Sequence, residues 1–395
     1  MACPTPSRHL ALPDVRCSER YMSEVACGNH TFLFSRRDQK GDHKSYETLV
    51  RVRRSTAPAR YGMVALTTAY SAAEVALPAS FLMSHNAAFM CVGAHIIAYG
   101  GMHHLPTSED WMGNDIGIVR RSASASSWPL KWSEARPVLS GDKAATGCVD
   151  RINNPCEYDG KLSVVRFRSR TLLFSRSNVS PEGGHRHVQV AHSPDGMSSW
   201  SRFAQLQIEG VAPGAWEIYF FCVRRVGSSA LARMGALRGD ESSSAGSLLL
   251  GLFPATSEEG RVAGIYMTTS ASRDGTQWSR PRMLKPSRHM GHGRTGDYPV
   301  DGQPLIADAL RVLIQHRIDL RDYAAEKDAD YDHDCDARRV GWGRTHVCEQ
   351  SVPAAQLLEF SEAGRGTTKP SRRAPVFGFP MRSLPRPSAM SSLIG

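Results

Sequence analysis

Five carboxylate side chains lie next to short apolar runs, where strands are expected to begin. Glu157 and Asp159 directly precede "GKLSVVRF", Glu217 begins "EIYFFCV", and Asp297 and Asp301 lie in "TGDYPVDGQPLI". Two carboxyl groups, one protonated and one ionised, suffice for general acid–base chemistry, because one donates a proton while the other attacks or activates water. Glu217 is the strongest candidate for the proton donor, since apolar neighbours disfavour its charged form.

Each of these acids also has a structural interpretation. Asp159 and Asp301 are both followed by glycine, and Asp-Gly is a strong hairpin-turn signal. The Glu217 carboxylate could equally accept hydrogen bonds from loop backbone. A catalytic role for Glu217, with Asp159 or Asp301 as the partner carboxylate, therefore requires that the fold bring them together.

Three arginines follow apolar strand cores at the same offset. Arg36 lies in "FLFSRR", Arg176 in "LLFSRS" and Arg317 in "LIQHRI". If the strands occupy equivalent places in repeated units, the guanidinium groups would cluster and bind a carboxylate, sulfate or phosphate. The alternative is that each arginine pairs with a loop acid or faces solvent.

The remaining polar motifs are weaker. His187, in "EGGHRHVQV", leads into an apolar run and could contact a ligand or shuttle a proton, although a surface position is commoner. The acid-rich segment "DADYDHDCD" at 328–336 lacks the glycine of a calcium-binding loop. No C-x-x-C pair is present, so we expect no metal ion and no cofactor.

The cysteines favour a reducing, intracellular compartment, although the location itself stays open. Nine is an odd number, the cysteines are scattered, and the N-terminal "MACPTPSRHLALPDVRC" lacks the apolar core of a secretory signal. Cys91 and Cys222 lie in apolar runs and are expected to be small buried hydrophobes. In an exported protein, Cys148 could pair with Cys156, or Cys335 with Cys348.

The composition is that of a folded globular chain. Of 395 residues, 41% are hydrophobic and 22% charged, and no apolar run reaches the roughly 18 residues of a membrane-spanning helix. Much of the net charge of +10 lies in the Pro-, Ser- and Arg-rich segment 361–395, which is expected to be disordered. Without interleaved aromatic residues this segment does not indicate specific nucleic-acid binding. We expect a monomer.

Short apolar runs bounded by turn residues extend from about residue 30 to 360, and they predict an all-β protein. Within them, "SPDGMSSW" from Ser193 and "SRDGTQW" from Ser272 repeat one pattern. Each predicts a hairpin turn in which Gly196 or Gly275 adopts a positive φ, the aspartate accepts backbone N–H bonds, and the tryptophan packs beneath as an apolar plug.

A hairpin that recurs in successive units indicates a β-propeller. The Trp-Ser pairs at Trp132, Trp200 and Trp278 are 68 and 78 residues apart (200 − 132 and 278 − 200). We predict five blades, with a sixth left open if segment 1–24 adds a closing strand to the last blade. The predicted propeller spans 25–360, and the expected blades cover 25–80, 84–140, 150–210, 214–288 and 297–360.

These loops resemble those of carbohydrate-active β-propellers. "SPDGMSSW" and "SRDGTQW" are similar to the S-x-D-G-x-x-W loops of five-bladed glycosidases of the arabinanase and fructosidase type. They are also similar to the Asp-box of six-bladed sialidases, S-x-D-x-G-x-x-W, but glycine directly follows aspartate here, which favours the five-bladed group. The motif is structural, so it indicates fold more than chemistry.

The resemblance implies a glycoside hydrolase-like enzyme acting on a glycan, with an anionic sugar favoured by the arginines. Glu217 would be the acid, Asp159 or Asp301 its partner, and Arg36, Arg176, Arg317, Glu157 and His187 would bind substrate. Five-bladed glycosidases usually have an essential aspartate on blade one, where "CGNHTF" offers no acid, and "SHNAAF" on blade two offers none either. A non-catalytic glycan- or protein-binding propeller and a phosphate-dependent glycoside phosphorylase therefore remain alternatives.

Overall fold

The computed structural model contains five antiparallel sheets, an additional short strand pair and one helical turn. The first sheet runs β1-β2-β3-β4 outward and the second β5-β6-β7-β8. The residues that the structure describes are 19–38, 46–54, 70–78, 85–101, 117–156, 158, 160–181, 185–227, 247–256, 263–286, 297–302, 310–317 and 345–352. The strands of the first two sheets are β1 (Glu19–Cys27), β2 (His30–Asp38), β3 (Tyr46–Arg54), β4 (Glu74–Leu77), β5 (His85–Val92), β6 (His95–Gly101), β7 (Gly117–Ser124) and β8 (Arg136–Ser140).

The next three sheets repeat this plan, and β13 and β18 join sheets three and four as a short parallel pair. The third sheet consists of β9 (Ser163–Phe167), β10 (Arg170–Asn178), β11 (Arg186–Ser193) and β12 (Ala204–Gln205). The fourth consists of β14 (Glu217–Ile218), β15 (Cys222–Val226), β16 (Leu248–Thr256), β17 (Ala263–Ser270) and β19 (Arg282–Pro286). The fifth consists of β20 (Asp297–Pro299), β22 (Leu310–Arg317) and β23 (Thr345–Val352), and β21 (Asp301–Gly302), which follows β20, pairs with β1. The remaining elements are β13 (Gln207–Ile208), β18 (Gln277–Trp278) and α1 (Lys143–Thr146).

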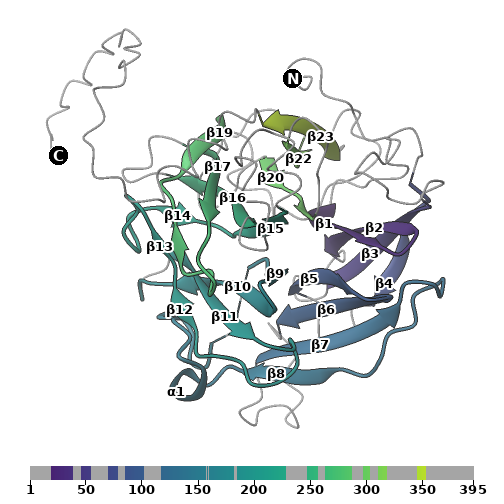
Figure 1. Cartoon of the computed structure of the whole chain (residues 1–395), viewed down its shortest axis with the longest axis horizontal. Helices are drawn as coiled ribbons and strands as arrows, with labels where there is room; N and C mark the ends of the chain where they lie inside the picture. The colour runs from purple at the N-terminus through teal and green to yellow at the C-terminus, as the bar shows by residue number, and fades with distance from the viewer. Residues whose placement is uncertain are drawn as a thin grey trace, which may run out of the picture.

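The five sheets are the blades of a propeller. Their innermost strands contact one another in the closed order β1, β5, β9, β15, β21 and back to β1. Figure 1 shows these strands around a common axis, with the later strands of each sheet lying farther out. The ring closes through a parallel pairing of β21 with β1, in which Ser23 is opposite Asp301 and Glu24 is opposite Gly302. The prediction of an all-β propeller with five blades is confirmed.

The first blade begins at Glu19 rather than at residue 25. Strand β1 is its innermost strand, and Gly28 and Asn29 form the turn to β2, so "CGNHTF" is not the start of the blade. Polar residues at Glu19, Ser23 and Glu24 hid this strand from a search for apolar runs, yet all three are buried. Segments 1–18 and 361–395 lie outside the described residues.

The repeated turns have the predicted geometry. In the third blade the Asp195 carboxylate accepts bonds from the backbone N–H groups of Met197 (2.8 Å) and Ser198 (2.9 Å), and Gly196 has φ +70°. In the fourth blade Trp278 is buried edge-on against Phe221, and its indole N–H donates to the Gly275 carbonyl at 2.7 Å. Each turn is therefore fixed by its own residues, with tryptophan beneath it.

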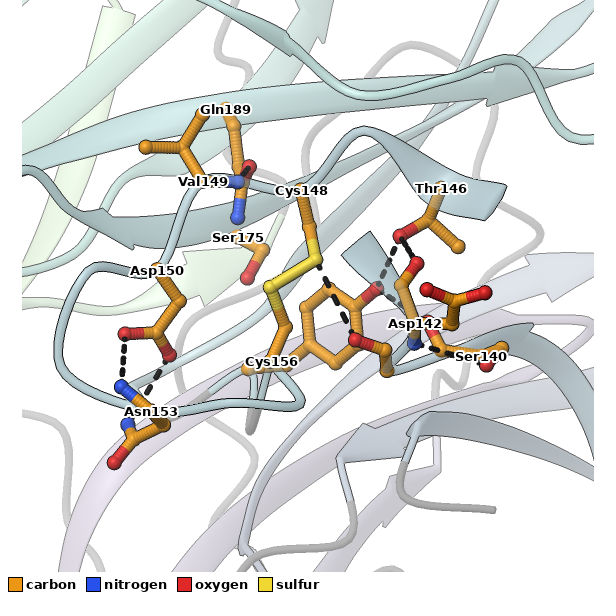
Figure 2. The surroundings of a disulfide bond; sticks show 12 residues. Ser140, Asp142, Thr146, Cys148, Val149, Asp150, Asn153, Cys156, Ser175 and Gln189 are labelled. Atoms are coloured by element: carbon orange, nitrogen blue, oxygen red, sulfur yellow. Dashed lines mark hydrogen bonds between the residues drawn. A yellow bond between two sulfur atoms is a disulfide. The ribbon is translucent and has the colours of Figure 1, made fainter. Parts of the chain in front are cut away.

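The described residues contain two disulfide bonds, which corrects the expectation that Cys91 is a free cysteine. Cys27 pairs with Cys91 and joins β1 to β5, so Cys91 is not a free buried hydrophobe. Cys148 pairs with Cys156, as the sequence left open (Figure 2). Cys222 is free and buried, as predicted. Disulfides are typical of oxidising compartments, so the cysteine pattern gives no support to an intracellular location.

The Cys148–Cys156 loop is held against the third blade. Gln189 of β11 accepts a bond from the Val149 N–H at 2.8 Å (Figure 2). The Asn178 side-chain amide donates to Asp150 at 3.0 Å. The loop leads directly toward the innermost strand β9. Within the described residues, no helix is long and apolar enough to span a bilayer, and no cluster of metal-binding side chains is found.

Candidate functional site

Aromatic side chains from three blades meet beside the innermost strands, where they form part of a hydrophobic core. Tyr21 of β1, Tyr219 and Phe220 between β14 and β15, and Tyr298 of β20 have ring centroids 5.6–6.3 Å apart, and we call them the axial aromatic cluster. The hydroxyl groups of Tyr21 and Tyr219 form a hydrogen bond of 2.7 Å. Tyr21 adopts φ +52°, a strained conformation for a non-glycine residue, at a register shift in β1.

Two of the three predicted arginines lie against this cluster. The Arg36 guanidinium lies 4.8 Å from the centre of the Tyr21 ring, and that of Arg176 lies 5.9 Å from Tyr219. Both are buried and come from the second strands of blades one and three. Arg317 ends β22, the second strand of blade five, at the corresponding place, but its side chain lies outside the described residues.

Glu217 belongs to the same site through a fourth arginine. Its carboxylate accepts a bond from the Arg186 side chain at 2.6 Å and from the Arg186 backbone N–H at 2.9 Å. The Arg186 guanidinium also lies 5.3 Å from the centre of the Tyr219 ring. Both Glu217 and Arg186 are partly exposed, so this pair is the part of the site that solvent reaches.

These contacts bear on the expected role of Glu217. A charge-assisted pair with arginine and a backbone N–H bond both stabilise the ionised carboxylate. The apolar neighbours in "APGAWEIYFFCV" had favoured the protonated form, but the third blade supplies a cation that sequence inspection could not see. The role of Glu217 as the catalytic acid stays a prediction, and the structure adds Arg186 as the partner of its carboxylate.

Blade one also carries an acid at its start, contrary to expectation. Glu19 is fully buried, and its two carboxylate oxygens accept bonds from Arg51 at 2.6 and 2.7 Å. Ser35 donates to the same carboxylate at 2.6 Å. Because its carboxylate oxygens bind Arg51 and Ser35 of the same blade, Glu19 has a structural role in blade one.

Asp301 lies in a second, deeper group of polar residues on the axis. Ser163 donates to its carboxylate at 3.2 Å, and the Lys161 ammonium lies 3.9 Å from it and 2.7 Å from the Ser23 hydroxyl. Burial raises the pKa of Asp301, although Lys161 and Arg224 oppose the shift. Asp301 is thus the carboxyl group with a raised pKa, while Glu217 is the ion-paired one.

The Asp301-Gly302 dipeptide does not form a hairpin turn. It forms β21, and a Cβ atom placed on Gly302 would lie 2.2 Å from the Glu24 carbonyl oxygen. Gly302 is therefore required for the close approach of two innermost strands. No hydrogen bond or ion pair links Asp301 to Glu217 among the described residues, so the structure places them in separate groups.

The other predicted site residues lie elsewhere. His187 is fully buried on β11, a third strand, with Nε2 2.9 Å from the Leu206 carbonyl oxygen. Burial lowers the pKa of His187, and the ring contacts the backbone that follows β12 at the outer edge of its sheet. Glu157 and Asp159 lie outside the described residues, in the segment between the Cys148–Cys156 loop and β9.

Sequence inspection missed several residues of both groups. Arg186 is the first residue of β11, the third strand of its sheet. The patterns considered were acids before a strand and arginines after a strand core, and Arg186 fits neither. Lys161 lies within "DGKLS", two residues after Asp159. A lysine so close to the predicted acids could have been proposed from the sequence as a partner for a carboxylate. Glu24 was missed because strand β1, to which it belongs, was not predicted. It accepts a bond from the Tyr70 hydroxyl at 2.5 Å, and burial raises the pKa of its carboxyl.

Comparison with known proteins rests on structure alone, since no family model matches the chain and no curated protein is detectably similar in sequence. The RS223 β-xylosidase structure aligns with a TM-score of 0.50 and 8% identity over 88% of this chain and 94% of that one. The chain therefore shares the fold of that structure. At such low identity the likeness concerns the fold and not the reaction.

Two further solved structures align less closely. The GH62 α-L-arabinofuranosidase catalytic domain of Coprinopsis cinerea has a TM-score of 0.47 and 12% identity, over 89% of this chain and 99% of that one. The Trypanosoma rangeli sialidase has a TM-score of 0.42 and 10% identity, over 88% and 57%. These two scores add no support beyond that of the xylosidase.

Proposed function

We propose that this protein is a glycoside hydrolase-like enzyme that acts on a glycan bearing an acidic group. The observation that carries the proposal is the convergence of Arg36, Arg176, Arg186 and Glu217 on the hydrogen-bonded pair Tyr21 and Tyr219. Aromatic faces with a few placed charged groups are typical of small-ligand sites, and arginine suits carboxylate, sulfate or phosphate.

Glu217 would supply the ionised carboxylate of the reaction. Its position at the start of the innermost segment of blade four, with partial exposure, lets a ligand reach it. The proton donor would be Asp301 or Asp159. Asp301 has a raised pKa, as a general acid requires, and Asp159 lies in the segment that leads to β9.

A phosphate-dependent phosphorylase is the second candidate. Hydrolysis needs two carboxyl groups about 5–10 Å apart, whereas phosphorolysis needs one proton donor facing bound phosphate. In the described part of the site Arg176 and Arg186 both lie near the Tyr219 ring, and only one carboxylate, that of Glu217, pairs with either of them, which favours phosphate. A non-catalytic glycan-binding protein is the third candidate, because the oxygens of Glu217 and Glu19 are already engaged by arginines.

The test is turnover of a panel of nitrophenyl glycosides, each uronic acid glycoside set beside its neutral counterpart, with and without inorganic phosphate. We expect turnover of acidic glycosides, and a loss of about 10²-fold or more in kcat for Glu217→Gln. Glu209→Gln is the matched control, because Glu209 is well exposed beside Arg280.

Each outcome separates the candidates. Turnover that requires phosphate identifies the phosphorylase, and glycan binding without turnover identifies the binding protein. Full activity of the Glu217→Gln variant would show that Glu217 has no role in catalysis, even if the glycosidase assignment held.

A further inference from the structure

Arg224 is buried near the axis without a hydrogen-bond partner. It lies on the innermost strand β15 and is 4% exposed. None of its three guanidinium nitrogens, Nε, Nη1 and Nη2, has a hydrogen-bond partner in the described structure. A guanidinium carries five N–H donors and is expensive to bury unsatisfied, so this residue needs an explanation.

Two buried arginines of blade one, Arg51 and Arg53, show how this fold accommodates a buried guanidinium group. Arg51 donates to both oxygens of Glu19. Arg53 lies 3.5 Å from the Glu24 carboxylate and stacks on the Tyr70 ring at 4.8 Å, although its Nε and Nη1 also lack partners. Arg224 alone among these three has neither a paired carboxylate nor an aromatic ring in the described structure.

The charges around Arg224 do not balance. Asp301 and Glu24 are within electrostatic range, but Asp301 already contacts Lys161 and Glu24 already contacts Arg53. The cations are Arg224, Lys161 and Arg53, and the carboxylates are Asp301 and Glu24. One positive charge (3 − 2) is therefore uncompensated among these residues. Burial raises the pKa of both carboxyl groups, so any protonation there increases the excess.

The free thiol nearby does not supply the missing charge. Cys222 lies two residues before Arg224 on the same strand, and burial raises its pKa well above the ordinary value. The thiol therefore stays neutral at physiological pH.

We propose that a small monovalent inorganic anion binds at Arg224 on the propeller axis, between the innermost strands of blades one, four and five. Chloride is the probe that fits this class. One negative charge matches the excess, and a halide accepts N–H bonds from any direction. A divalent phosphate would reverse the imbalance in a buried setting. This site is separate from the arginines of the axial aromatic cluster and does not depend on the proposed reaction.

The test is thermal unfolding of the full chain in sodium chloride and in sodium gluconate at equal ionic strength. A ligand that binds only the folded state raises the melting temperature, so we expect a saturable rise of about 2 °C or more in chloride. Arg224→Met should abolish the chloride-specific rise. Arg225→Met is the matched control, because Arg225 is the next residue on β15 and is exposed, and it should keep the rise.

A second measurement covers the case in which Arg224→Met does not fold. Crystals of the unsubstituted protein soaked in bromide should give an anomalous peak within hydrogen-bond distance of the Arg224 guanidinium. Equal melting temperatures in chloride and gluconate would overturn the proposal. So would an unchanged chloride effect in Arg224→Met, or electron density for water without anomalous signal at Arg224.

Discussion

The hydroxyl groups of Tyr21 and Tyr219 lie 2.7 Å apart, although 198 positions separate them in the sequence. Tyr21 belongs to the innermost strand of blade one and Tyr219 to the innermost segment of blade four. Arg36 lies over the first ring, and Arg176 and Arg186 lie near the second. This hydrogen bond therefore joins the two halves of the candidate site.

A double-mutant cycle tests that link. Tyr21→Phe and Tyr219→Phe should each lower the free energy of unfolding by about 0.5–1.5 kcal/mol, the usual net value of one hydrogen bond. Because both substitutions remove the same bond, the double variant should cost less than the sum of the single effects. Urea unfolding measures all four proteins. Additive losses would show that the two hydroxyl groups act independently.

Gly275 should be more sensitive to substitution than Gly28, although both have a positive φ. An added Cβ at Gly275 would lie 3.0 Å from Leu172 Cδ1 and 3.1 Å from Phe174 Cζ, whereas one at Gly28 would meet nothing within 4 Å. Gly28→Ala should cost about 1–2 kcal/mol from backbone conformation alone, and Gly275→Ala about 1–3 kcal/mol more from crowding. Equal losses in urea unfolding would contradict the packing of this turn.

The two disulfides should differ in their effect on stability. Cys27–Cys91 closes a loop with a sequence separation of 64, and Cys148–Cys156 one of 8. In the chain-entropy treatment the longer loop contributes about 2 kcal/mol more. Paired Cys→Ala variants compared by urea unfolding measure the difference, and peptide mapping without reductant checks the pairing. A larger loss from the shorter loop would rule out this entropic explanation.

His187 should make stability depend on pH. Burial lowers the pKa of the folded-state ring, so below about pH 6.5 the unfolded chain binds the proton more readily. The free energy of unfolding should therefore fall as pH drops below that value. His187→Gln should lose less stability than the unsubstituted protein between neutral and mildly acidic pH in urea titrations. Parallel pH profiles would show that folding does not lower the pKa of His187.

Arg186 should determine the preference for acidic ligands under the proposed function. Arg186→Met removes a charge-assisted hydrogen bond worth about 1.5–3 kcal/mol, so KM for an acidic glycoside should rise roughly ten- to hundredfold. KM for the neutral counterpart should change much less. The control is Arg280→Met, whose side chain is 73% exposed. Equal changes for both glycosides would indicate that Arg186 supports the site without contacting the acidic group.

Local chemistry accounts for what could be predicted from the sequence. The Ser193–Trp200 and Ser272–Trp278 turns are fixed by bonds within a few residues, so their glycines, aspartates and tryptophans revealed the repeated hairpin and the propeller. The pairing of Cys148 with Cys156 was likewise a readable alternative, because the loop between them is short.

The polar interior could not be predicted in this way. Strand β1 was overlooked because Glu19, Ser23 and Glu24 make it look like a surface segment, and only partners from other strands and blades allow these groups to be buried. The pairing of Glu217 with Arg186 could not be predicted, because Arg186 is 31 residues away in the chain.

The sequence by itself thus determined that short strands and tryptophan-plugged turns repeat around an axis. Only the tertiary structure decided which charged groups meet there: Glu217 with Arg186, Asp301 with Lys161, and Arg224 with no partner among the described residues. The physical reason is that turn energetics act over a few covalently linked residues. Charges are paired across blades only after the ring has closed.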